Sequence, residues 1–309
     1  MAKLIRASGY QLGTHLAEGD LLPPDVSCPL CLSQQRREPA LLLQRDPEVL
    51  LLACRDCGGF SASRMPADAT RVEYYAGYYA NTRGAHVTGD PQALGSHIAR
   101  RLRPLLQGAR FSILDFGGGD GTLSYSLADT LLKGAAESVR VVVVDYEPQV
   151  RESFSPAISI QRAPALDAIA GAQFDVVLAS AILEHIPYPR RELVQLLNAV
   201  RPGGEFYART PTIAPLLRIL RAFGVSCDFT YPAHVHDLGP AFWGRVLSVL
   251  PVDRERYRLI SQGPSAVETA FRQFPLRTAA AYILKAPGYV FRGRYPFAGG
   301  WEVIFQRLR

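Results

Sequence analysis

Short apolar runs alternate with helical spacings through the middle of this 309-residue chain. Residues 111–113, 141–144 and 174–179 are apolar runs that predict strands, and the four valines of the second run are typical of a buried parallel strand. Residues 201–208 predict a turn and a further strand. The segment before that turn has apolar residues at helical spacing: Leu193, Leu196, Leu197 and Val200. Strands that alternate with helices predict an α/β fold with a doubly wound, Rossmann-like sheet.

The flanking segments carry weaker patterns. Residues 96–107 predict a helix that leads into the sheet, and residues 214–220 predict a short amphipathic helix. Near the end of the chain we expect a strand over 267–271 and a helix over 277–287 that Pro287 stops. Residues 299–307 alternate as a closing antiparallel strand does.

These patterns predict four regions. Residues 1–70 form an N-terminal metal-binding module, 71–107 a tyrosine-rich connector with the leading helix, 108–211 the cofactor-binding core, and 212–309 a substrate insertion with closing strands.

A glycine loop between the first strand and its helix is the strongest chemical signal. Gly117, Gly119 and Gly121 alternate there, which lets the backbone approach a nucleotide-like ligand without Cβ clashes. Asp115 stands where a phosphate would otherwise be bound, so the loop suits a ligand with a cationic or amine-bearing part. Asp145 ends the next strand, where doubly wound folds bind ribose hydroxyls. On these residues alone a dinucleotide-binding dehydrogenase remains an alternative.

The order of the later segments favours another family. Asp115-x-Gly-x-Gly-x-Gly, followed by FDVVLAS at 174–180, LEHIPYP at 183–189 and VRPGGEFY at 200–207, resembles the class I S-adenosylmethionine-dependent methyltransferases. The resemblance implies that S-adenosylmethionine is the cofactor. It implies these cofactor-binding residues: Asp115, Gly117, Gly118, Gly119, Gly121, Asp145, Tyr146 and Ser180.

Two Cys-x-x-Cys pairs precede this core. Cys28 and Cys31 form the first pair, and Cys54 and Cys57 form the second, with a predicted hairpin between them. Four thiolates at this spacing predict one structural zinc ion with a closed tetrahedral site. A redox dithiol normally occurs once beside a βαβ unit, and a disulfide framework conflicts with the lack of a signal peptide, so both are disfavoured. The fifth cysteine, Cys227, is expected to be a buried thiol.

The acceptor site is expected after the fifth strand. Tyr231-x-x-His234 there, together with the four-cysteine module and the tyrosine-rich segment 73–81, is similar to the sugar C-methyltransferases. That resemblance implies His234 as the base and Tyr231 as a hydrogen-bond donor. His185 is the third candidate catalytic residue, at a position that in class I methyltransferases lines the cofactor pocket. O-methylation of a glycan or natural product, and a scaffold protein without catalysis, remain alternatives. The tyrosines form either a lid or a packing surface between the modules.

Composition limits the partners. The chain is 48% hydrophobic and 20% charged with a net charge of +6, as in an ordinary globular protein without a basic block, so nucleic acid is not the expected partner. The expected partner is a small-molecule substrate, such as a sugar or phosphate-bearing compound, for which Lys285, Arg292 and Arg294 are candidate contacts. No signal peptide or spanning segment is evident, which predicts a cytoplasmic location.

Overall fold

The computed structural model describes residues 15–82, 90–102, 110–134, 136–146, 149–225, 229–269, 271–272, 274–291 and 295–309. Several sequence expectations lie outside these residues: Cys227, Arg292, Arg294 and the 103–107 end of the leading helix. None of the helices in the described part of the chain is long and apolar enough to cross a lipid bilayer.

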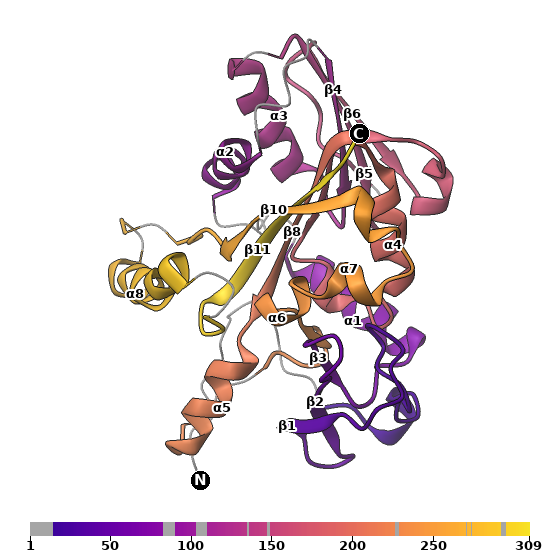
Figure 1. Ribbon diagram of the computed structural model, residues 1–309, viewed down its shortest axis with the longest axis vertical. Coiled ribbons are helices and arrows are strands. Elements are labelled where there is room, and N and C mark those ends of the chain that lie inside the picture. The colour runs from indigo at the N-terminus through magenta and orange to yellow at the C-terminus, as the bar shows by residue number, and fades with distance from the viewer. Residues whose placement is uncertain are drawn as a thin grey trace.

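A seven-stranded mixed sheet forms the centre of the molecule in the order β10-β11-β8-β7-β4-β5-β6 (Figure 1). Its strands are β4 (Arg110–Phe116), β5 (Ser138–Val144), β6 (Ile158–Ala163), β7 (Phe174–Ser180), β8 (Val200–Thr212), β10 (Tyr257–Pro264) and β11 (Gly299–Arg307). Strands β4 to β8 are parallel, whereas β11 pairs antiparallel with both β8 and β10. This is the predicted Rossmann-like sheet, with the predicted closing strand.

Helices cover both faces of the sheet. Helices α2 (Pro91–Arg101) and α3 (Thr122–Gly134) pack on one face, where Ile98 and Leu127 are fully buried against β4 and β5. Helices α4 (Arg190–Ala199), α6 (Pro240–Trp243) and α7 (Val246–Val249) pack on the other face, where Leu196 and Trp243 are buried. The leucines at helical spacing thus form the buried stripe of α4, as the sequence predicts.

A second, smaller sheet carries the four cysteines. It has the order β1-β2-β3-β9, with β1 (Glu38–Gln44), β2 (Val49–Ala53), β3 (Phe60–Ala62) and β9 (His236–Asp237). The first two strands are the predicted hairpin. The fourth strand comes from the region after β8, because Ser61 of β3 pairs with His236 of β9. The N-terminal module and the insertion therefore form one structure, to which α5 (Ala214–Ala222) adds apolar side chains.

The structure corrects two expectations near the C-terminus. Residues 265–269 form no strand, and Glu268 instead forms an ion pair with Arg209 of β8. Helix α8 (Pro275–Phe291) runs through Pro287 rather than stopping there. Tertiary contacts on both sides of the proline outweigh its local effect, because Lys285 and Gly288 both pack against the end of β10.

Candidate functional site

The glycine loop joins β4 to α3 at the carboxyl edge of the parallel strands. Gly119 has a φ of +57°, and its amide donates a 2.8 Å hydrogen bond to Oδ2 of Asp145. Gly117 has a φ of +71°, and a Cβ there would lie 2.3 Å from Cγ1 of Ile182. Gly119 therefore requires glycine for its backbone conformation, and Gly117 requires it both for its conformation and for its close contact with Ile182. The structure brings the loop and Asp145 together as the sequence predicts.

Asp115 lies beneath this loop with 1% of its surface exposed. Burial raises the pKa of its carboxyl to about 6, and the nearby carboxylates of Asp145 and Asp120 act in the same direction. Among the described residues, Oδ2 of Asp115 has no hydrogen-bond partner. A buried acceptor of this kind is costly unless a ligand donates to it, so it fits the amine-bearing cofactor that the sequence suggests.

The other predicted cofactor residues lie around the same edge. Tyr146 follows Asp145 and is 87% exposed, with its ring open to a ligand. Ser180 ends β7, and its hydroxyl accepts a 3.0 Å hydrogen bond from Nε of Arg209, its register partner on β8. The Arg209–Glu268 ion pair continues this polar network. The sequence did not predict Arg209 or Glu268, since only their approach across the sheet reveals them.

Two histidines meet beside the end of β7. The rings of His185 and His234 are 4.8 Å apart between centroids, at an angle of 64°. His185 belongs to the short 3₁₀ helix η3 (Leu183–His185), and Ala181, just before η3, has a φ of +56°. Thr230, four residues before His234, has a φ of +70°. Residues other than glycine rarely adopt this conformation, and it clusters at functional sites.

Hydrogen bonds fix the tautomers of both rings. Nδ1 of His185 lies 2.8 Å from the carbonyl of Ala233, which can only accept, so this nitrogen carries the proton. The hydroxyl of Thr230 donates to the carbonyl of Phe229 and therefore accepts from Nδ1 of His234 at 2.7 Å. Nε2 is thus the basic nitrogen of each neutral ring.

Burial keeps both rings neutral. It lowers the pKa of His185 to about 4. Burial, and secondarily the adjacent His185, hold the pKa of His234 well below its usual value. Glu184 is 1% exposed, and burial raises the pKa of its carboxyl to about 8. The pair therefore lies beside a buried carboxyl, with an oxygen of Glu184 and one ring nitrogen of each histidine within 4.8 Å of one another, and its uncharged imidazoles can accept a proton.

Two other polar side chains near His234, those of Tyr231 and His236, form hydrogen bonds within the protein. The hydroxyl of Tyr231 donates a 3.2 Å hydrogen bond to the carbonyl of Arg64, in the cysteine module. His236 is fully buried, with Nδ1 3.0 Å from Oγ of Ser61 and Nε2 2.9 Å from the carbonyl of Ile186. These bonds tie the loop of His234 to the N-terminal module.

The tyrosine-rich segment forms helix α1 (Asp68–Thr82). Tyr75 packs edge-on against His185 with ring centroids 6.2 Å apart, and Tyr74 packs against Tyr75 at 5.4 Å. The side chains of Tyr78 and Tyr79 lie outside the described residues. This segment therefore contributes at least one ring to the wall of the histidine site.

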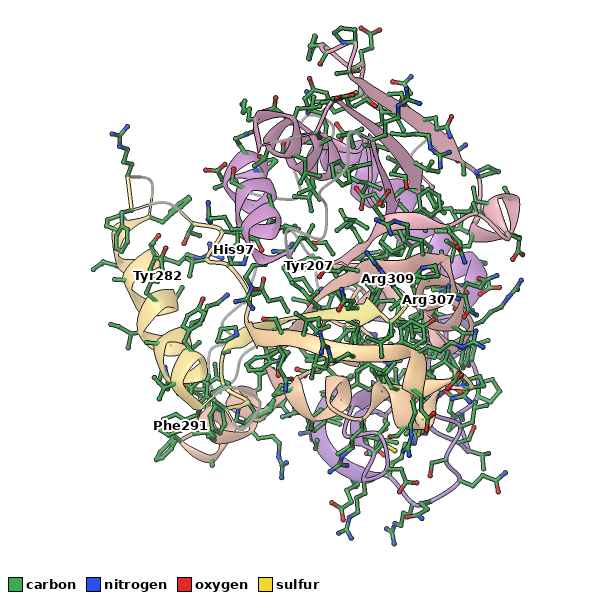
Figure 2. All side chains as sticks on the ribbon, turned by 45° about the horizontal axis from the view of Figure 1, so that its top comes forward. His97, Tyr207, Tyr282, Phe291, Arg307 and Arg309 are labelled. Carbon is green, nitrogen blue, oxygen red and sulfur yellow. The ribbon has the colours of Figure 1, made fainter. Side chains whose placement is uncertain are left out.

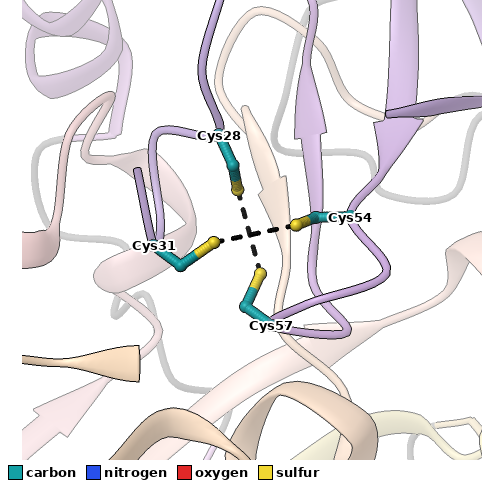
Figure 3. Close-up of side chains that lie close together, drawn as sticks. All are labelled: Cys28, Cys31, Cys54 and Cys57. Carbon is teal, nitrogen blue, oxygen red and sulfur yellow. Dashed lines mark hydrogen bonds between the residues drawn. The ribbon is translucent and has the colours of Figure 1, made fainter. Parts of the chain in front are cut away.

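The four cysteines converge on one point (Figure 3). Sγ of Cys28 lies 3.8 Å from Sγ of Cys57, and Sγ of Cys31 lies 3.7 Å from Sγ of Cys54. Four sulfurs at about 2.3 Å from a tetrahedral zinc ion lie about 3.8 Å apart, so the spacing fits zinc and is too long for disulfide bonds. Gly58, in the second knuckle, packs so closely on α6 that a Cβ there would lie 2.9 Å from Ala241.

The chain matches the methyltransferase domain family over residues 89–247, just over half of its length, and it belongs to that family. Membership of this family sets aside the dehydrogenase. The matched residues include the glycine loop, Asp145 and both histidines of the pair.

Two relatives are ubiquinone biosynthesis O-methyltransferases. The one from Methylobacterium sp. (strain 4-46) is 32% identical over 132 residues, covering 38% of this chain and 46% of that protein. The mitochondrial one from Schizosaccharomyces pombe is 33% identical over 118 residues, covering 35% of this chain and 40% of that protein. The chain thus spans about half the length of the curated relatives it matches.

Solved structures resemble this chain at low sequence identity. The plantazolicin methyltransferase BpumL is 14% identical with a TM-score of 0.45, over 78% of this chain and 91% of that one. A chain of the Haloferax volcanii complex between the Trm112 methyltransferase activator and a methyltransferase is 14% identical with a TM-score of 0.42, over 77% and 97%.

Proposed function

We propose that the protein transfers the methyl group of S-adenosylmethionine to a hydroxyl oxygen of a small molecule held beside His185 and His234. The observation that carries this proposal is the pair of neutral imidazoles, 4.8 Å apart, whose tautomers leave Nε2 as the basic atom. The names of the relatives support oxygen as the acceptor atom, since both are O-methyltransferases.

The cofactor would occupy the carboxyl edge above the glycine loop. Asp145 would accept hydrogen bonds from ribose hydroxyls, and the exposed ring of Tyr146 would contact the base. Asp115, with its unpartnered buried oxygen, would receive the charge of the amino-acid part, and Ser180 would line the same edge beside Arg209. When bound, S-adenosylmethionine supplies an electrophilic methyl group on a sulfonium centre.

The chain's own residues would then position the acceptor and take its proton. The acceptor oxygen forms a bond to the methyl carbon, and the electron pair of the broken carbon–sulfur bond goes to sulfur. Nε2 of His234 accepts the hydroxyl proton, and His185 orients the acceptor from the facing side. Tyr75 packs edge-on against His185 and shields that side of the pair from water, which helps the site to hold the acceptor in position.

Oxygen is favoured over a sugar carbon for a structural reason. C-methylation next to a ketone needs a donor to stabilise an enolate. The hydroxyl of Tyr231, the expected donor, is hydrogen-bonded to Arg64 and has a raised pKa because of burial. We therefore assign Tyr231 a positioning role for the loop of His234 rather than the role of donor.

We further propose that Cys28, Cys31, Cys54 and Cys57 bind one structural zinc ion. The sulfur spacing supports this assignment. All four ligand positions of a tetrahedral ion would be filled by thiolates, so no position remains for a substrate.

Calorimetry and product analysis test the function. Purified protein should bind S-adenosylhomocysteine, and incubation of S-adenosylmethionine with a panel of phenols and glycosides should give a methyl ether, identified by mass spectrometry and NMR. A product with a new carbon–carbon bond would overturn O-methylation while leaving the family intact. Absence of S-adenosylhomocysteine binding by folded protein would overturn the proposed cofactor site.

A further inference from the structure

Helix α8 presents its large apolar side chains to solvent. Leu276 is 86% exposed, Ile283 74% and Val290 76%, and their spacing of seven places them on one line along the helix. With about 1.5 Å per residue this line is about 21 Å long. Figure 2 shows Tyr282 and Phe291 on the outer side of the same helix, and both are about half exposed or more. Exposed apolar patches of this extent mark interaction sites.

The inward face of α8 is polar and fixes this orientation. Lys285 is buried, and its Nζ donates to the carbonyl and Oγ of Ser265 at 2.6 and 2.9 Å. Thr278 is buried and donates a 2.8 Å hydrogen bond to Oγ1 of Thr269. A Cβ at Gly288 would lie 2.5 Å from a side chain of β10. Rotating the helix to bury its apolar line would break these contacts, so the outward apolar face belongs to the fold.

The charge around this face has one sign. Between residues 269 and 301 the sequence contains no Asp or Glu, and its charged residues are Arg272, Arg277, Arg292, Arg294 and the inward-facing Lys285. Arg292 and Arg294 lie outside the described residues. Arg272 and Arg277 are exposed. A second copy of the chain would bring the same positive face against itself without a carboxylate to pair with it. Anionic lipid headgroups would supply the missing negative charge.

We infer that α8 docks the protein on an anionic lipid bilayer. Leu276, Ile283 and Val290 enter the boundary between headgroups and acyl chains, with the helix lying in the plane of the membrane. Tyr282 and Tyr289, both 49% exposed, lie on one flank of this line, where tyrosine suits the interface, and Tyr282 stacks on Phe271 with ring centroids 5.7 Å apart. The exposed Arg272 and Arg277 contact the headgroups. This is peripheral binding and requires no membrane-spanning helix.

The position of α8 connects the membrane to the carboxyl edge of the sheet. The strand before it ends at Pro264, which pairs with Trp301, and the strand after it begins at Gly299, which pairs with Thr212 at the end of β8. Both ends of the helix therefore attach at the edge that holds the glycine loop. The inference concerns binding alone and does not depend on the proposed function.

Co-sedimentation with vesicles tests the inference. The full chain should bind vesicles of phosphatidylglycerol mixed with phosphatidylcholine and bind phosphatidylcholine alone at least tenfold more weakly. Ile283→Glu should lower the partition coefficient by about tenfold or more. The change removes an apolar side chain that the membrane would bury and adds a negative charge that anionic lipids repel. Val26→Glu is the matched control, since Val26 is 90% exposed on the cysteine module, and should bind as the native protein does. Arg277→Gln should weaken binding about fivefold, and added salt should weaken it further.

Three outcomes would overturn the inference. The first is equal vesicle binding by the native protein and by Ile283→Glu, with thermal melts showing that both are folded. The second is the absence of binding to anionic vesicles at low salt. The third is a stable dimer in sedimentation velocity that Ile283→Glu converts to monomer, which would assign the face to a second copy. None of these measurements uses enzyme activity, so their failure is separate from failure of the proposed O-methylation.

Discussion

Replacement of His234 by alanine separates acceptor chemistry from cofactor binding. The change removes the Nε2 base, and general-base catalysis by a positioned side chain contributes about 10²–10⁴-fold to the rate. The glycine loop is held by Asp145 rather than by His234, so S-adenosylhomocysteine affinity should stay within about twofold. The loop that carries His234 should lose little stability in this variant, because the hydroxyl of Thr230 keeps its hydrogen bond to the carbonyl of Phe229.

A second variant, Thr230→Val, tests how much the hydrogen bond to His234 contributes to turnover. Thr230→Val keeps the imidazole of His234 but removes the acceptor 2.7 Å from its Nδ1. A lost hydrogen bond of about 0.5–1.5 kcal/mol corresponds to a loss of about 2–13-fold in turnover, well short of the loss in His234→Ala. The assay is transfer of a labelled methyl group to the best acceptor, with calorimetry of S-adenosylhomocysteine on each variant. Near-native turnover by His234→Ala, or an equal loss in cofactor affinity, would refute the assignment.

The pH dependence gives an independent check on the same pair. Burial lowers the pKa of His185 to about 4 and holds that of His234 well below its usual value. A base with a lowered pKa loses activity only as the pH falls through that lowered value. Turnover should therefore show no histidine inflection between about pH 6 and 8, and an inflection near pH 6.5 that His234→Ala removes would contradict the half-buried, neutral pair.

Four further outcomes are expected. Cys54→Ser should lower the bound zinc found by elemental analysis and unfold the N-terminal module, seen as faster proteolysis there, before it alters S-adenosylhomocysteine binding. Asp145→Ala should weaken that binding by about 1–3 kcal/mol in calorimetry, because it removes a polar partner of the cofactor and of the loop. Tyr231→Phe should cost about 1 kcal/mol of stability in denaturant melts with turnover nearly unchanged, whereas a loss of turnover above a hundredfold would restore its role as donor. Burial raises the pKa of Glu184 to about 8, so the folded chain holds this proton more tightly than the unfolded chain does. The cofactor-free protein should therefore lose stability as the pH rises from about 5 to 8, and thermal melts of Glu184→Gln should show a smaller loss.

The parts of the fold that sequence could predict are those encoded by neighbours along the chain. The glycine loop, the valine strand before Asp145 and the leucine stripe of α4 each occupy one short segment, and the structure has all three. The sequence also predicted the four-cysteine cluster, because the spacing within each Cys-x-x-Cys pair is a local feature. The prediction that Pro287 stops the helix was wrong for the opposite reason, since the contacts of α8 on either side of it come from Pro264, at the end of β10, and from Ser265, just after it.

The sequence predicted the candidate site only in part, because the other contacts of the site join segments that are far apart in the chain. Tyr231 was expected at the acceptor from its motif, yet its hydroxyl bonds to Arg64, 167 residues earlier in the chain. The buried oxygen of Glu184 depends on how η3 packs, and the partnership of Arg209 with Ser180 depends on β7 and β8 lying side by side. No pattern along the sequence specifies such pairs, whereas the sheet register does.

These distant contacts connect the cysteine module to the histidine pair, a connection that its sequence does not suggest. Strand β3 follows the second cysteine pair, and it pairs with β9, which begins two residues after His234. His236 adds a bond to Ser61 on one side and to the carbonyl of Ile186, next to His185, on the other. The two loops that bring the histidines together are thus both fastened to the module. A metal ion that orders the four cysteines would therefore also support the spacing of His185 and His234, although it would lie outside the proposed reaction.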